Sequence, residues 1–264
     1  MSIDIKTDDV AIDIDSDKNE LLNGNMPKKK FFRSRAHCNP LSHNDGFNYP
    51  LEPTLDVWQP LYPNINKSDL VVRHLDIGMG FGGLTIALAK TYPNQLVLGM
   101  EIRAKVCEYV RLRISGLRKD FPGEYENAAC IRTNCMRYLP NFFNKQQLHK
   151  IFFCFPDPHF KHKNHRRRII SFSLLSEYAY LLAPKGRLYT ITDVEELHNW
   201  HVEKCSSHYL FRRLNDEELN NDEAVSLICN ETEEGIKVSR LNGKKFFAVF
   251  ERLDDIETSH LSPI

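Results

Sequence analysis

The amino-acid sequence predicts an α/β protein with a doubly wound, mainly parallel sheet and late antiparallel strands. Three observations support this fold class. From residue 71 onward, short apolar runs alternate with segments that have helical spacing. A glycine-rich turn from Gly78 to Gly83 follows the first of these runs. The run 150–155 is almost entirely apolar and is bounded by Pro156, which is typical of a strand covered on both faces.

The first half of the sheet is predicted between residues 71 and 132. The apolar run 71–77 predicts a strand, and a helix over 82–90 begins in the glycine turn. The run 95–101 predicts a second strand that ends in a carboxylate, Glu101. Apolar residues at helical spacing predict a helix over 104–118, and 127–132 predicts a third strand.

The second half follows from residue 150 to residue 253. Strands are expected over 150–155 and 187–192, with helices over 173–182 and 195–206. Two late strands are expected over 210–214 and 246–253, the second entered through the turn Asn242-Gly243. The sequence contains no internal repeat, which indicates one domain with two tails.

The net charge of zero conceals an uneven distribution of the 35 basic and 35 acidic side chains. Residues 1–26 carry seven acids and two lysines, and residues 203–264 carry thirteen acids and eight bases. Residues 27–202 therefore carry 25 bases against 15 acids. A segment with this excess of positive charge can bind a polyanion. The alternative explanation for the charges is that they lie on solvated faces of helices.

The predicted organisation has four parts: a disordered acidic tail at 1–26, a basic extended arm at 27–66, a Rossmann-like domain at 67–255 and a tail at 256–264. No apolar segment has the length of a membrane span, and no secretory signal is found, so we expect a soluble intracellular protein. The seven cysteines form no CxxC pair, which argues against a zinc ribbon or a disulfide framework.

In a sheet of this kind ligands bind beyond the carboxyl ends of the strands. Gly78 and Gly80 follow the first strand, and Glu101, at the end of the second strand, can accept hydrogen bonds from both hydroxyls of a ribose. Both features suit NAD as well as S-adenosylmethionine, and Asp76 two residues before Gly78 favours the latter. Asn134 and Cys135 follow the third strand, where adenine edges are commonly bound.

The fourth strand is followed by Asp157, which is held between Pro156 and Pro158. An ordinary turn carboxylate is the alternative, but a cationic run comes directly after this turn. That run, His159 to Arg168, contains five permanently charged side chains and three histidines. With so many cations adjacent, contact with a phosphate backbone accounts for it better than a metal site does.

These segments closely resemble the eukaryotic tRNA (guanine-N7-)-methyltransferase family. The matching stretches are RSRAHCNP (33–40), DIGMGFGGL (76–84), LGMEIRAKV (98–106), LPNFF (139–143), FPDPHFK (155–161), YTITDV (189–194) and ETEEGIKV (231–238). The resemblance implies a class I S-adenosylmethionine-dependent methyltransferase that methylates N7 of a guanine in the variable loop of tRNA. It also implies a separate WD40 β-propeller subunit in a heterodimer and residence in the nucleus, with the cytoplasm as a second compartment.

The resemblance also implies roles for individual residues. Asp157 matches the catalytic position. The positions implied for cofactor binding are Gly78, Gly80, Glu101, Ile102, Arg103, Asn134, Cys135, Cys154 and a late loop of Thr232, Glu233 and Glu234. The positions implied for contact with tRNA are Arg35, His37, Lys161 and Arg166, and no metal is expected. Three alternatives remain open: a dinucleotide-dependent oxidoreductase, a non-catalytic RNA-binding module, and methylation of another base or of mRNA.

Overall fold

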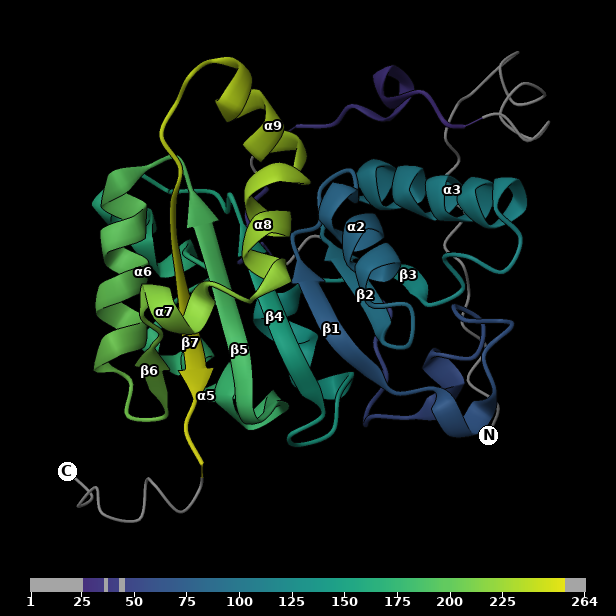
Figure 1. The fold of residues 1–264 in the computed structure, drawn as a ribbon, viewed down its shortest axis with the longest axis horizontal. Coiled ribbons are helices and arrows are strands. Elements are labelled where there is room, and N and C mark those ends of the chain that lie inside the picture. The colour runs from purple at the N-terminus through teal and green to yellow at the C-terminus, as the bar shows by residue number, and fades with distance from the viewer. Residues whose placement is uncertain (1–25, 36–37, 43–45, 255–264) are drawn as a thin grey trace.

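The fold is one seven-stranded sheet with helices on both faces (Figure 1). We describe residues 26–35, 38–42 and 46–254 of the computed structural model. The strands are β1 (Val72–Ile77), β2 (Leu96–Glu101), β3 (Ala128–Arg132), β4 (Leu148–Cys154), β5 (Leu182–Thr192), β6 (Phe211–Arg213) and β7 (Phe246–Arg252). The α-helices are α2 (Gly83–Thr91), α3 (Ala104–Asp120), α4 (Cys135–Tyr138), α5 (Phe172–Leu181), α6 (Glu195–Ser207), α7 (Asp216–Leu219), α8 (Glu223–Asn230) and α9 (Glu233–Arg240). Short 3-10 segments are η1 (Lys29–Phe32), η2 (Leu55–Val57), η3 (Lys67–Asp69), η4 (Leu139–Asn141) and η5 (His162–Arg167).

The strand order is β3-β2-β1-β4-β5-β7-β6, and β1 to β5 are parallel. Strand β7 runs antiparallel to both β5 and β6. The chain therefore reverses its direction of winding between β1 and β4. In open parallel sheets the ligand crevice lies at this switch point, beyond the carboxyl ends of the strands.

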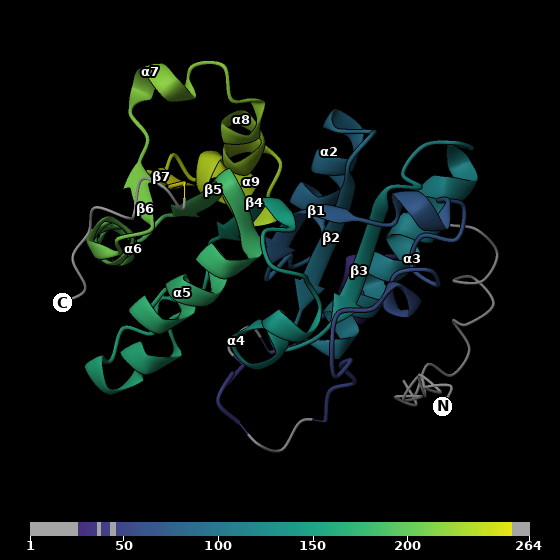
Figure 2. The same cartoon turned by 90° about the horizontal axis from the view of Figure 1, so that it is seen from below.

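Helices cover both faces of the sheet (Figure 2), and a hydrophobic core lies between the helices and the sheet on each side. On one face, side chains of α2, α3 and α8 pack against alternate strand residues such as Val97 and Phe152. On the other, α4, α5, α6 and the segment around Trp58 and Tyr62 pack against residues such as Leu98 and Phe153. The alternation of faces along each strand explains why apolar residues of the central strands point to both faces of the sheet.

The segment before β1 contacts helix α3 and the residue that begins helix α4. Phe32 is buried against Tyr109 of α3, with ring centroids 5.6 Å apart. Farther along, the carbonyl oxygen of Pro40 accepts a hydrogen bond of 2.6 Å from Asn134 Nδ2. The predicted tails and His37 lie outside the residues described, and the predicted division into four parts stays a prediction. Within the described ranges, no helix is long and apolar enough to cross a membrane.

The predicted order of strands and longer helices is confirmed, and the short helix α4 after β3 was not predicted. Three further places need correction. The predicted strand 150–155 ends at Cys154, because Phe155 has a positive φ of 50° and leaves the strand. Strand β5 begins at Leu182, five residues before the predicted start at Arg187. Three helices, α7 to α9, occupy the segment between the late strands, for which no helix was predicted.

Candidate active site

Two adjoining cavities, of about 220 and about 410 Å³, open at the carboxyl ends of the central strands. Both are lined by Gly78, Arg103, Cys154 and Asp157. The first also contains the other predicted residues on β2 and after β3: Glu101, Ile102, Asn134 and Cys135. The second contains Gly80, Thr232, Glu233 and Glu234. The structure thus brings together all of the residues predicted for catalysis and cofactor binding, and their individual roles remain predictions.

The glycine turn after β1 leaves room for a ligand beside its backbone. Gly78 and Gly80 have φ values of +73° and +55°, a left-handed conformation that glycine adopts without steric cost. A Cβ built at either position would meet no atom within 4 Å, so open space lies beside both. This space fits the predicted role of the turn, which is to let a cofactor approach the backbone.

Asp76, at the end of β1, is buried below this turn and accepts a hydrogen bond of 2.7 Å from Thr85 Oγ1. Burial raises the pKa of Asp76 to about 7, although the Thr85 hydroxyl opposes the shift. The folded protein therefore retains a proton that the unfolded chain loses near pH 4, so folding stability attributable to Asp76 decreases as pH rises from about 4 to about 7.

For this reason we expect an Asp76→Asn variant to lack this pH dependence. The free energy of unfolding of the wild type, relative to the variant, is expected to fall by about 3 kcal/mol between pH 5 and pH 8. Urea unfolding of both proteins at four pH values measures this difference. Parallel pH profiles for the two proteins would contradict the assignment of a raised pKa.

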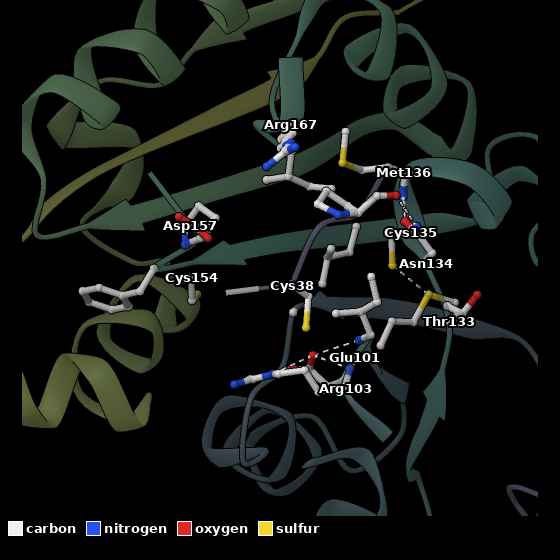
Figure 3. Close-up of a pocket in the computed structure, with 18 of the residues that line it drawn as sticks. Cys38, Glu101, Arg103, Thr133, Asn134, Cys135, Met136, Cys154, Asp157 and Arg167 are labelled. Atoms are coloured by element: carbon white, nitrogen blue, oxygen red, sulfur yellow. Dashed lines mark hydrogen bonds and ion pairs between the residues drawn. The ribbon is translucent and has the colours of Figure 1, made fainter. Parts of the chain in front are cut away.

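Glu101 is a buried carboxylate whose oxygens already have protein partners. Its Oε1 accepts hydrogen bonds from the backbone N–H groups of Ile102 and Arg103, at 2.8 and 3.0 Å. The Arg103 guanidinium donates to both oxygens, including a contact of 2.8 Å from Nη2 to Oε2. Figure 3 shows this pair on one side of the cavity, with Asp157 and Arg167 on another. Among the contacts described, Oε2 accepts only the bond from Arg103 Nη2, so it keeps a site for one ribose hydroxyl, and a bond from the second hydroxyl requires the guanidinium to move.

Asn134 and Cys135 form the start of helix α4. The Asn134 Oδ1 caps this helix by accepting from Met136 N at 3.1 Å, and its Nδ2 binds Pro40, so both ends of the amide are engaged in holding the loop. Cys135 is buried, and burial raises the pKa of this thiol and of the Cys154 thiol. The two cysteines therefore act as neutral, apolar parts of the cavity wall.

The turn that carries Asp157 is strained. Phe155 and His159 have φ values of 50° and 45°, and a non-glycine residue in this region costs about 1 kcal/mol. Asp157 Oδ1 accepts from the His159 N–H at 3.2 Å, which orients the carboxylate within the turn. Strain of this kind persists only where the surrounding structure holds it, and it is concentrated at functional sites.

The predicted late loop of Thr232, Glu233 and Glu234 is the beginning of a helix. Thr232 caps α9, with its Oγ1 accepting from Gly235 N at 3.0 Å. Glu233 contacts the protein on three sides, accepting from Gly83 N and pairing with Lys29 and Arg113. The prediction of a loop was wrong because the cap and the buried face of α9 fix a helix, although the segment does line the second cavity.

Of the residues predicted to contact tRNA, Arg35, Lys161 and Arg166 are exposed, and His37 is outside the described ranges. The contact of the cationic run with phosphate stays a prediction, but Arg168 of this run is 1% exposed and so is not available for it. In the described part of the chain no cluster of three or more potential ligands is placed to hold a metal ion.

Sequence reasoning missed several residues that line the two cavities: Cys38, Thr133, His159, Arg167 and Asp193. Asp193 directly follows β5, so inspection of every strand's carboxyl end could have found it. Cys38 comes from the segment far ahead of the sheet, and no spacing in the sequence connects it to the site.

The sheet order, the glycine turn and the carboxylate at the end of β2 define a doubly wound, nucleotide-binding fold of the kind that S-adenosylmethionine-dependent methyltransferases share. Residues 71–248 match the family model described as "Putative methyltransferase". The chain is 51% identical over 228 residues to the tRNA (guanine-N(7)-)-methyltransferase of Anopheles gambiae, covering 86% of this chain and 96% of that relative. It is 51% identical over 239 residues to the enzyme of that name from Schizosaccharomyces pombe, covering 88% and 87%. The zebrafish (Danio rerio) enzyme of that name is 50% identical over 238 residues, covering 88% and 98%. The chain belongs to the tRNA (guanine-N(7)-)-methyltransferase family.

Proposed function

We propose that this protein transfers a methyl group from S-adenosylmethionine to N7 of a guanine in the variable loop of tRNA. The observation that carries the proposal is the position of Asp157, on a strained turn that lines the same two cavities as the glycine turn. Membership of the family supports the substrate. It also decides against the oxidoreductase alternative, since the family's chemistry is methyl transfer.

For methyl transfer to guanine N7, the main requirement is that the protein positions the guanine relative to the methyl donor. The bound donor supplies an electrophilic methyl group on a sulfonium. Guanine N7 carries a lone pair and no proton, so no general base is needed to activate it. The ring becomes positively charged as the bond forms, and a carboxylate beside it stabilises that charge. Asp157 can also accept hydrogen bonds from N1–H and the exocyclic amine of guanine, which places N7 toward the donor.

The tRNA is proposed to bind through the exposed cations after this turn. Lys161 directly precedes η5 and Arg166 lies within it, and both are exposed. Arg35 is exposed on the segment before β1. Unstacking a guanine from folded RNA costs a few kcal/mol, which contacts with phosphates offset. Because such contacts release counterions, affinity for tRNA depends strongly on salt.

We therefore expect tRNA affinity to fall at least tenfold between 50 and 200 mM salt, and Lys161→Ala to reduce the slope of log K against log salt by about one. Filter binding at five salt concentrations measures both quantities. Lys67→Ala is the matched control, because this exposed lysine lies on η3, before the amino end of β1. A salt slope near zero would contradict tRNA as the substrate, and an unchanged slope in Lys161→Ala would remove Lys161 from the contact surface.

We also propose a separate WD40 β-propeller subunit as partner and residence in the nucleus. The partner is supported by the resemblance to the eukaryotic family, and the nucleus by that resemblance and the lysines at 28–30. Label transfer from methyl-labelled S-adenosylmethionine to unmodified tRNA, measured with and without a propeller subunit, tests the function and the partner together. Label in 7-methylguanosine supports the function. Cofactor binding with no label, even with the partner, would discard tRNA as the substrate and leave two alternatives, a non-catalytic RNA-binding module and methylation of another RNA.

A further inference from the structure

Arg168 differs from every other cation in the run after Asp157, because it is 1% exposed and cannot reach RNA. Its guanidinium contacts two separate parts of the fold. Nε donates a hydrogen bond of 2.9 Å to the carbonyl oxygen of Pro158, the residue directly after Asp157. Nη2 donates at 2.6 Å to Glu196 Oε1 on helix α6, and the guanidinium lies 4.7 Å from the centre of the Trp200 ring on the same helix.

The helix that receives Arg168 is itself fixed to this segment. Trp200 Nε1 donates at 2.8 Å to the carbonyl oxygen of Ile170, two residues after Arg168. The backbone N–H of Arg168 donates at 2.9 Å to His165 O and so ends the 3-10 segment η5. Arg168 therefore connects the Asp157 turn, the exposed cationic segment and α6 at one point.

The Asp157 turn needs such a connection, because Pro156 and Pro158 have no N–H with which to bind neighbouring backbone. At the start of the turn, Phe155 N–H donates at 2.8 Å to Ile191 O of β5. At its end, Arg168 holds the Pro158 carbonyl. These two bonds lie on either side of Asp157, between the two residues with positive φ.

The burial of Arg168 is difficult to explain by stability alone. A buried ion pair often contributes no more to stability than apolar residues of similar volume. Here the partner Glu196 keeps 56% of its side chain exposed and can be solvated without Arg168, whereas Arg168 Nη1 has no hydrogen-bond partner in the described structure. The bond from Arg168 to the Pro158 carbonyl, which fixes the Asp157 turn, explains the burial of this arginine better than stability does.

We propose that Arg168 is a positioning residue, which fixes the Asp157 carboxylate relative to the guanine by holding the Pro158 carbonyl against α6. The inference rests on the proposed function, because it concerns the rate of methyl transfer to guanine. Arg168 touches neither substrate nor donor, since it lines neither cavity. Its loss therefore affects the rate of transfer and leaves donor affinity intact.

The test compares Arg168→Met with Arg252→Met. Arg252 is a matched control, because it is 3% exposed and its Nε also donates to a backbone carbonyl, that of Ala179 at 3.1 Å, on an element that does not line either cavity. The measurements are the single-turnover rate of methyl transfer at saturating donor and tRNA, the Kd for S-adenosylhomocysteine, and the melting temperature. Rates are measured at least 15 °C below the lower melting temperature.

We expect Arg168→Met to lose about 100-fold in single-turnover rate, the size of effect associated with a misplacement of about 1 Å. The Kd for S-adenosylhomocysteine should change less than threefold, and Arg252→Met should keep the wild-type rate. In Arg168→Ala, added guanidinium at millimolar concentration should restore part of the rate, since a guanidinium can refill the site without the side chain.

The outcomes separate this inference from the proposed function. If the wild type transfers no methyl group to tRNA, the proposed function fails first. If the wild type is active and Arg168→Met is equally active, only the positioning role is overturned. Equal rate losses in Arg168→Met and Arg252→Met would show a general structural role of buried arginines and would also overturn the positioning role. A donor affinity that falls in parallel with the rate would overturn it for the same reason.

Discussion

Asp157→Asn is expected to lose at least 100-fold in methyl transfer at saturating donor and tRNA. The asparagine keeps the shape of the side chain but removes its negative charge and replaces one acceptor with a donor. It can no longer accept from both N1–H and the exocyclic amine of guanine, and it does not stabilise the cationic ring. Loss of one such preorganised electrostatic group costs about 100- to 1000-fold in rate. The readout is 7-methylguanosine in digested RNA over a single turnover.

The control for this prediction is Asp69→Asn, which makes the same chemical change at an exposed carboxylate on η3, away from both cavities. The Kd for S-adenosylhomocysteine should stay within threefold of wild type in both variants. A rate near wild type in Asp157→Asn would remove Asp157 from the chemistry. A parallel loss of donor affinity would mean that the residue shapes the cofactor cavity instead.

The central half of the fold was predictable because its signals are local. Strands β1 to β4 are short apolar runs, and the glycine turn marks the passage from β1 to α2. Helices α7, α8 and α9 were not predicted, because they have only four, eight and eight residues and depend on packing for stability. Ala224 and Ile228 of α8, for example, are buried in the core that covers α2. The local signals for this region were the spacing from Asn215 to Glu218, which forms a capping box, and the N-caps Asp222 and Thr232.

In the candidate site, too, the features that depend on neighbouring residues in the sequence were predictable, and those that depend on tertiary contacts were not. Residues directly after a strand, such as Gly78 and Asp157, could be placed at the cavities from the sequence. The partners of these residues could not. The pairing of Glu233 with Lys29 joins positions 204 residues apart, and a run of cations gives no sign that Arg168 alone turns inward. Burial and tertiary contacts decide these roles, and a single sequence does not contain them.

Glu101→Gln is expected to weaken binding of S-adenosylhomocysteine by about 100-fold. A carboxylate that accepts hydrogen bonds from two ribose hydroxyls contributes about 1.5 kcal/mol or more for each bond, and a difference of 1.4 kcal/mol changes a Kd tenfold. The glutamine amide is neutral and offers one acceptor in place of two, so one charge-assisted bond from the ribose is lost and the other is weakened. Isothermal titration with S-adenosylhomocysteine gives the Kd. Glu108→Gln is the control, because Glu108 also pairs with an arginine, Arg111, but lines neither cavity.

A second ligand separates ribose binding from a general effect on the site. S-adenosylhomocysteine without its 2′-hydroxyl lacks one of the two proposed donors to Glu101. In the wild type, loss of this hydroxyl should weaken binding about tenfold, because one bond to the carboxylate is lost. In Glu101→Gln the same change of ligand should have a smaller effect, since a bond to the neutral amide is weaker than a bond to the carboxylate. If both proteins lose affinity equally on removal of the hydroxyl, the two changes are independent and Glu101 does not bind the ribose. Its bidentate contact with Arg103 would then be structural, and the adenosine would be held by other residues of the cavity.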